Sequence, residues 1–183
     1  MKQGILIATL ASVAACASSG TSGSSEPAVN QRVLVSDETH SSIRTSADPS
    51  GVEAVIAAPP DKVWAALLVA YPAMGIPALS INRPIGEVGN RNFRILHKLS
   101  GEPASIYLNC GFDALVGPQA NSYPIDASML TVIRPDSAGA THIETRLSGS
   151  ARKIGVVADP LYCGSTGALE RKLTEAVRKQ VTP

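Results

Sequence analysis

Aromatic residues are scarce in this chain, and neither sign of charge is in clear surplus. The seven aromatic side chains all lie between Trp64 and Tyr162, so the first 63 residues contain none. The formal net charge of the 183 residues is +1. Proteins that bind nucleic acid through its phosphates carry a basic surplus, and a single net charge is no such surplus. The composition therefore argues against nucleic acid as a partner.

Sequence motifs for catalysis and metal binding are also missing. The chain has no H-E-x-x-H, no G-x-S-x-G and no phosphate-binding loop. Residues 150–153 fit S-x-x-K, but they end a predicted strand instead of opening a helix, and neither S-D-N nor K-T-G follows. His142 and Glu144 fit the H-x-E pattern of zinc deaminases without its P-C-x-x-C partner. We therefore expect no enzymatic activity, no metal and no cofactor.

A run long enough to span a membrane is missing too, because the apolar run near the start is short. Residues 4–15 supply roughly a dozen mostly apolar positions, whereas a spanning helix needs about 20. A positive charge at Lys2 precedes them, which is typical of a signal peptide. The run ends in Val-Ala-Ala-Cys at residues 13–16, and this ending resembles a bacterial lipobox.

The lipobox resemblance implies a lipid anchor at Cys16. In that family the cysteine thiol receives a diacylglycerol, and the leader, here residues 1–15, is removed. Two or more acyl chains hold a protein stably on a bilayer, whereas one chain binds reversibly. Ala17, in place of Asp, implies a protein of the outer membrane that faces the periplasm. The alternative is an ordinary signal peptide followed by an incidental cysteine.

Residues 16–50 are predicted to form the lipidated cysteine and a flexible tether. They are rich in Ser and Gly and contain no aromatic side chain, so they cannot bury enough apolar surface to offset the entropy of ordering. Residues 31–35, Gln-Arg-Val-Leu-Val, are the exception, since they fit either one strand or a short docking segment. Loss of Lys2 with the leader would leave 15 basic and 15 acidic residues.

Residues 51–183 are predicted to form one globular domain that begins with a strand and a helix. Residues 52–56 fit the strand. Pro60 and Asp61 suit a helix start, because proline fits the first helical position and an acid the positive end of the dipole. The helix is expected to end between Pro72 and Gly75. Its apolar face, with Trp64 in the core, consists of Val63, Trp64, Leu67, Leu68 and Tyr71.

Several strands are predicted after this helix. Residues 92–99 alternate apolar and polar side chains, which places His97 in the interior with a hydrogen bond. The most secure hairpin joins residues 123–134 to 141–152, with His142 and Glu144 facing outward as part of a solvated cross-strand pairing. Short strands are expected at 79–81 and 104–109, a turn at 84–89 and a loop at 111–122.

The last predicted element is an amphipathic helix over residues 165–181. Leu169, Leu173 and Val177 recur every four residues on one face, and Ser165 or Thr166 can cap the first amides. A helix with one apolar face needs a surface to cover, and the antiparallel sheet supplies it. The order of elements therefore predicts an α+β fold in which the sheet carries this helix on one face.

A resemblance to known domains supports this fold. It rests on residues 55–67 (Val-Ile-Ala-Ala-Pro-Pro-Asp-Lys-Val-Trp-Ala-Ala-Leu), on Gly-Ile-Pro at 75–77 and on Gly-Glu-Val-Gly at 86–89. These residues resemble the opening of the helix-grip domains in the lipoprotein of the outer-membrane β-barrel assembly machinery, and more distantly START-like domains. The resemblance covers roughly residues 52–98, and the segment 110–123 matches neither family.

The two resemblances imply different functions. The assembly-machinery lipoprotein implies a non-enzymatic envelope lipoprotein whose domain docks onto another envelope protein. START-like domains imply the alternative, a carrier that holds a lipid or small hydrophobic ligand between the sheet and the C-terminal helix. Leu169, Leu173 and Val177 would leave no such pocket if they fill that space.

The cysteine count predicts one disulfide bond. With Cys16 lipidated, Cys110 and Cys163 remain as a pair in an oxidising compartment. Their bond would close a loop of 54 residues, stabilise the fold by roughly 4 kcal/mol in the chain-entropy account and pin the C-terminal helix to the sheet. The alternative is a reactive Cys163 thiol at the start of that helix.

One basic cluster is a candidate binding surface. Arg91, Arg94 and Lys98 lie along one short stretch, and the arginine fork suits carboxylate and phosphate groups. The ligand would be a lipid headgroup or an acidic patch on a partner. The alternative is an ordinary solvated face of the sheet.

Overall fold

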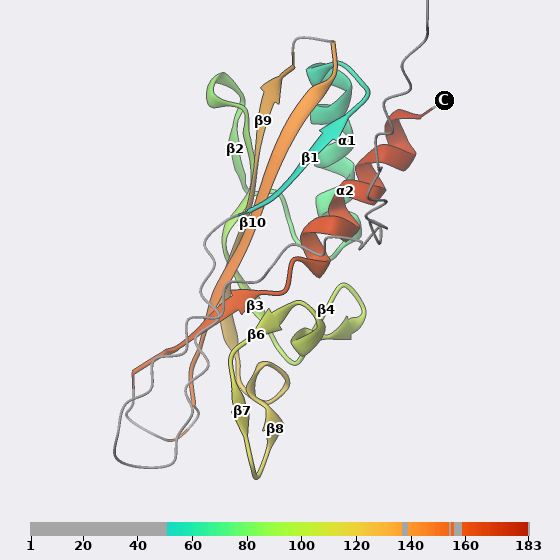
Figure 1. Ribbon diagram of the computed structural model, residues 1–183. Coiled ribbons are helices and arrows are strands. Elements are labelled where there is room, and N and C mark those ends of the chain that lie inside the picture. The colour runs from blue at the N-terminus through green and yellow to red at the C-terminus, as the bar shows by residue number, and fades with distance from the viewer. Residues whose placement is uncertain (1–50, 137–138, 154, 156–158, 183) are drawn as a thin grey trace, which may run out of the picture.

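The computed structural model of this protein describes residues 51–136, 139–153, 155 and 159–182. The predicted leader, the lipidation site at Cys16, the tether and the segment 31–35 lie outside the described residues. Within these residues the fold is α+β, as predicted: an antiparallel sheet with two helices packed against it, one of them C-terminal (Figure 1). No helix among the described residues is both long and apolar enough to cross a membrane.

The main sheet is built around the long hairpin of β9 (Ile125–Pro135) and β10 (Thr141–Ala151), which confirms the predicted hairpin. The strands follow the order β2-β3-β9-β10-β11-β6, and β1 also pairs with β10. β1 and β11 share one edge of β10, opposite residues 141–145 and 148–151 respectively. The remaining bounds are β1 (Val52–Ile56), β2 (Ser80–Asn82), β3 (Glu87–Ile95), β6 (Leu108–Asn109) and β11 (Leu161–Ser165).

Helix α1 (Pro60–Ala73) confirms the predicted first helix and its limits. Pro60 stands in the first turn, where a missing amide hydrogen leaves no helical bond unmade. The helix ends before Gly75, whose φ of 77° turns the chain so that the Ile76 amide donates to the Tyr71 carbonyl at 3.1 Å. Trp64 is buried, as predicted.

Helix α2 (Ala168–Val181) begins three residues later than predicted, because Ser165 is the last residue of β11. The predicted capping side chains act just ahead of the helix. Ser165 Oγ accepts from the Gly167 amide at 2.9 Å, and Thr166 Oγ1 accepts from the Ala168 amide at 3.3 Å. Leu169, Leu173 and Val177 are fully buried, which confirms the apolar face.

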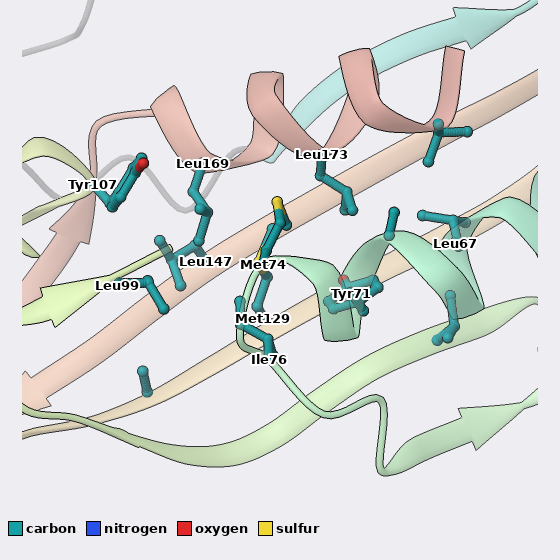
Figure 2. Close-up of a cluster of buried hydrophobic side chains, with 14 of the residues drawn as sticks. Leu67, Tyr71, Met74, Ile76, Leu99, Tyr107, Met129, Leu147, Leu169 and Leu173 are labelled. Carbon is teal, nitrogen blue, oxygen red and sulfur yellow. The ribbon is translucent and has the colours of Figure 1, made fainter. Parts of the chain in front are cut away.

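The core lies between the two helices and the sheet. Figure 2 shows Leu169 and Leu173 of α2 beside Met74, the residue that follows α1, with Leu147 and Met129 of the sheet beneath them. Each fully buried side chain of this size contributes roughly 1.5–3 kcal/mol relative to exposure. The two helices also pack directly on each other, so both are held on the same face.

The strand predicted at 92–99 is wrong at both ends. β3 begins at Glu87, where a turn was expected, and the short 3-10 helix η1 (Arg83–Ile85) makes the turn instead. β3 stops at Ile95, because the φ of 66° at His97 turns the chain away from the sheet. The chain then forms β4 (Lys98–Leu99), which pairs with β5 (Glu102–Pro103). His97 is therefore exposed instead of interior, with Nδ1 2.6 Å from the Asn121 carbonyl oxygen.

Two further segments differ from the predicted elements. Residues 104–109 form a 3-10 turn, η2 (Ala104–Ile106), and then β6, instead of one strand. The predicted loop at 111–122 contains a small hairpin of β7 (Phe112–Asp113) and β8 (Gly117–Pro118), followed by η3 (Gln119–Asn121). Gly111 and Gly117 have φ of 92° and 78°, values that favour glycine and allow the tight return.

Candidate functional site

An apolar groove lies between α1 and the edge strand β2. Its volume is about 460 Å³, and it is lined by Leu68, Pro72, Gly75, Pro77, Ala78 and Ile81. β2 ends the strand order, so no strand among the described residues pairs with its outer edge. We call this feature the α1–β2 groove.

Large apolar side chains stand exposed beside the α1–β2 groove. Leu79, next to the lining residue Ala78, is 76% exposed, and the lining residue Ile81 is 55% exposed. Val69, which follows the lining residue Leu68 in α1, is also more than half exposed. Exposed apolar side chains that gather beside a hollow mark interaction surfaces in soluble proteins, whereas scattered ones are ordinary.

The turn after α1 is the reason that these side chains face solvent. Ile76 is fully buried and holds the chain to the core. The Asn90 side-chain amide donates to the Pro77 carbonyl at 2.8 Å, and this bond ties the following segment to β3. Held at both points, the chain lays Pro77, Ala78 and Leu79 along the surface. The sequence signal for the groove was this apolar run before a short edge strand.

The same face of α1 becomes polar near the start of the helix. A second hollow of about 260 Å³ is lined there by Asp61 and Trp64, which continue the face of Leu68 and Pro72 at helical spacing. Arg83 Nη2 donates to Asp61 Oδ1 at 2.6 Å, and the guanidinium carbon lies 5.5 Å from the centroid of the Trp64 ring. The Arg83–Asp61 ion pair therefore lies against the Trp64 ring at the N-terminal end of this helix face.

The space between the sheet and α2 is filled with side chains. Leu169, Leu173 and Val177 of α2 and Ile143 and Leu147 of β10 are all buried. Both hollows described above lie on the other side of α1, against β2 and η1. Buried apolar side chains therefore occupy the position where a START-like carrier would hold its ligand.

The sequence carries no sign of the buried carboxyl group of Glu170, because this residue stands next to the apolar stripe of α2 and not within it. Its Oε1 accepts from the Ser165 hydroxyl at 2.5 Å and from the Leu147 amide at 3.2 Å. Its Oε2 is buried and has no hydrogen-bond partner in the described structure. Burial raises the pKa of Glu170 above its usual value of 4.5. These contacts tie the first turn of α2 to β10 and β11.

The predicted basic cluster does not converge on one point. Arg91 donates to Glu87 Oε1 at 2.5 Å, and Arg94 stands opposite Asp126 in the β3–β9 register. Lys98 lies in the separate β4–β5 ladder, beyond the point where β3 ends. All three side chains are exposed. Binding of an anion or an acidic partner to this cluster stays a prediction.

The H-x-E residues of β10 have structural partners. His142 Nε2 lies 3.5 Å from Glu53 Oε2 on the neighbouring strand β1, which is the predicted cross-strand pairing. Glu144 was expected in solvent but is buried, because the guanidinium groups of Arg146 and Arg134 cover it. Among the described residues no cluster of three or more His, Cys, Asp or Glu side chains is placed to hold a metal.

Cys110 and Cys163 form the predicted disulfide bond. The bond was expected to pin α2 to the sheet, but it does not. Cys163 lies within β11, five residues before α2 begins. The bond joins β11 to the segment that follows β6, and these two strands already pair through Asn109 and Gly164. It therefore fixes the base of the β7–β8 hairpin.

Comparison of the chain with protein-family models, curated proteins and solved structures gives no match. The resemblance to helix-grip and START-like domains accordingly stays a prediction.

Proposed function

We propose that this protein is a non-enzymatic docking module of the bacterial cell envelope, tethered to the membrane through Cys16. The α1–β2 groove is its binding site, and the occupant is an extended apolar segment of a partner envelope protein. The single observation that carries the proposal is the apolar groove beside a strand edge with which no described strand pairs, bordered by the exposed Leu79 and Ile81.

The chemistry of the groove suits an extended peptide. A strand edge offers backbone amides and carbonyls to an added strand, and neighbouring apolar pockets select its side chains. β2 supplies the edge, and Leu68, Pro72 and Ile81 supply the apolar wall. A bound strand would cover Leu79 and Ile81 and remove apolar surface from water, which stabilises the complex by about 25 cal/mol per Å².

The filled space beneath α2 favours docking over the alternative of a lipid or small-ligand carrier. A carrier needs a concave site that buries most of its ligand. Leu169 and Leu173 occupy the position of that site, whereas the α1–β2 groove is open along the molecular surface. A carrier would need α2 to move away from the sheet and expose these side chains.

Site-specific crosslinking in cells tests the docking proposal. We expect a photoreactive phenylalanine analogue at position 79 or 81 of the full chain to form one adduct of discrete mass with an envelope protein. The change Ala78→Asp, which places a charge in the groove lining, is expected to abolish that adduct. The matched control carries the analogue at the exposed Glu175 of α2, far along the chain from the groove.

Two results would contradict this proposal. The first is an identical adduct from position 175, which would mean non-specific proximity. The second is the absence of an adduct from positions 79 and 81 in cells where the full chain is present at its normal level. Stoichiometric lipid in an organic extract of the purified protein would favour the carrier instead.

The membrane anchor is tested separately. We expect the mature protein to begin at Cys16 and to carry the mass of a diacylglycerol and any further acyl chain. The variant Cys16→Ser is expected to lack that mass and to leave the membrane fraction on washing. An unmodified mature chain with a free Cys16 thiol would contradict the anchor while leaving the groove untouched.

A further inference from the structure

The β7–β8 hairpin presents large apolar side chains at its tip. We define the hairpin tip as residues 112–117, Phe-Asp-Ala-Leu-Val-Gly. Leu115 is 96% exposed and Phe112 is 74% exposed, and about half of Val116 is exposed. The hairpin projects as a narrow finger from one end of the molecule (Figure 1). These apolar side chains stand on a projecting hairpin, whereas those beside α1 border a groove.

Several polar backbone groups of the hairpin tip have hydrogen-bond partners within the hairpin or at its base. The Leu115 amide donates to Asp113 Oδ1 at 2.9 Å, and the Ser122 hydroxyl donates to the Val116 carbonyl at 3.1 Å. The strand pairs Phe112 with Pro118 and Asp113 with Gly117 close the ladder behind the turn. Internal pairing matters because a backbone group that enters a lipid environment unpaired costs several kcal/mol.

The charge around the hairpin tip is balanced at its base. Asp113 is the only charged residue from 111 to 119, and Lys153 Nζ lies 3.8 Å from its Oδ2. The same ammonium group lies 5.9 Å from the centroid of the Tyr123 ring. A lysine beside a tyrosine is the combination found at membrane interfaces, where lysine reaches toward anionic headgroups and the aromatic ring lies at headgroup depth.

The base of the hairpin is held rigidly. The Cys110–Cys163 bond lies two residues before Phe112, and the Gln119 amide donates to the Gly111 carbonyl at 3.0 Å. A tip that is already ordered loses little conformational entropy on binding. Most of the free energy gained by burying its apolar surface therefore contributes to affinity.

We infer that the hairpin tip inserts Phe112, Leu115 and Val116 into the interfacial region of a lipid bilayer. A projecting finger with exposed apolar side chains, several paired backbone groups and a cationic, aromatic base fits a lipid interface. This second membrane contact goes beyond the docking proposal. It depends neither on lipidation of Cys16 nor on the α1–β2 groove, and it orients the domain with β7 and β8 toward the membrane.

Tryptophan fluorescence with brominated lipids tests the insertion. The full chain is reconstituted in vesicles of phosphatidylethanolamine and phosphatidylglycerol, with or without bromine on the acyl chains. We expect bromination to quench the emission of Leu115→Trp. The matched control is Leu79→Trp, which alters an exposed leucine in the groove region and is expected to show no quenching. The native Trp64 is buried and gives the same background in both proteins.

Three outcomes would overturn the inference. No quenching of Leu115→Trp would leave the tip in water. Equal quenching of Leu115→Trp and Leu79→Trp would mean that the whole domain collapses on the bilayer. A blue shift of Leu115→Trp that follows protein concentration and not bromination would place the tip against protein instead of lipid.

Vesicle binding without the acyl anchor supplies a second measurement. In a Cys16→Ser background, Leu115→Asp is expected to weaken co-sedimentation with the same vesicles by at least about tenfold, because it removes apolar carbons and adds a charge. Leu79→Asp in that background is expected to leave binding unchanged. Leu115 is almost fully exposed, so its replacement leaves the packing of the core intact. Equal binding by both variants would contradict insertion of the tip.

Discussion

The hydroxyl group of Tyr71 on α1 lies 2.9 Å from Oγ1 of Thr131 at the middle of β9. Thr131 in turn lies 2.9 Å from Oγ1 of Thr145, its register partner on β10. All three side chains are fully buried, and this chain of hydroxyl groups links the helix to the central hairpin. Burial also raises the pKa of Tyr71, so the phenol keeps its proton and both hydrogen-bonding roles.

Removal of this hydroxyl is expected to weaken the domain. Tyr71→Phe leaves Thr131 with one fewer buried partner, and we expect the free energy of unfolding to fall by about 1–2 kcal/mol. Urea denaturation measures the change. The matched control is Tyr162→Phe, which alters a half-exposed tyrosine and is expected to have little effect. Equal losses from the two variants would contradict a specific role for the buried hydroxyl.

The disulfide bond is expected to stabilise the fold by restricting the unfolded chain. The double change Cys110→Ser and Cys163→Ser opens a sequence separation of 53 residues, and we expect a loss of roughly 4 kcal/mol. Reduction of the native protein is expected to lower the free energy of unfolding by a similar amount. The free energy of unfolding of the double variant is expected to be the same with and without the reductant. Unchanged stability of the native protein on reduction would refute this prediction.

Gly89 is expected to tolerate no side chain. Its φ is 152°, and an added Cβ would lie 2.2 Å from the Met129 carbonyl oxygen and 2.9 Å from the Leu130 Cα on β9. Gly89→Ala must therefore push β3 away from β9, and we expect a loss of more than about 3 kcal/mol in thermal or urea unfolding. Gly101 also has a positive φ, but an added Cβ meets nothing within 4 Å. The control Gly101→Ala is thus expected to cost only about 1–2 kcal/mol.

The buried Glu170 is expected to make stability depend on pH. The pKa of Glu170 is raised in the folded protein. As pH rises above about 4.5, the carboxyl group therefore loses its proton in the unfolded chain while the folded protein still holds it. Stability is therefore highest below pH 4.5 for this group and falls as pH rises through the folded pKa. We expect Glu170→Gln to flatten that part of the curve of unfolding free energy against pH. Glu175→Gln, on the exposed face of the same helix, is expected to leave the curve unchanged.

The predicted elements that agree with the structure are those set by local rules. The limits of α1 follow from Pro60 and from the positive φ of Gly75, and both signals lie within a few residues of the helix ends. The β9–β10 hairpin follows from the turn residues at 135–140 and from the alternation of residues 142–147 in the second strand. The Cys110–Cys163 pair follows from counting, because one cysteine belongs to the predicted leader junction.

Only the tertiary structure decided where the surfaces and buried polar groups lie. Alternation predicted an interior His97, but the left-handed backbone at that residue ends the strand and turns its ring outward. The helical phase marked Leu169 as buried, but contacts with β10 and β11 also enclosed Glu170. The groove beside Leu79 and the finger that carries Leu115 depend on which strands form edges. Strand order and helix docking arise from contacts between residues far apart in the chain, and local periodicity carries no record of them.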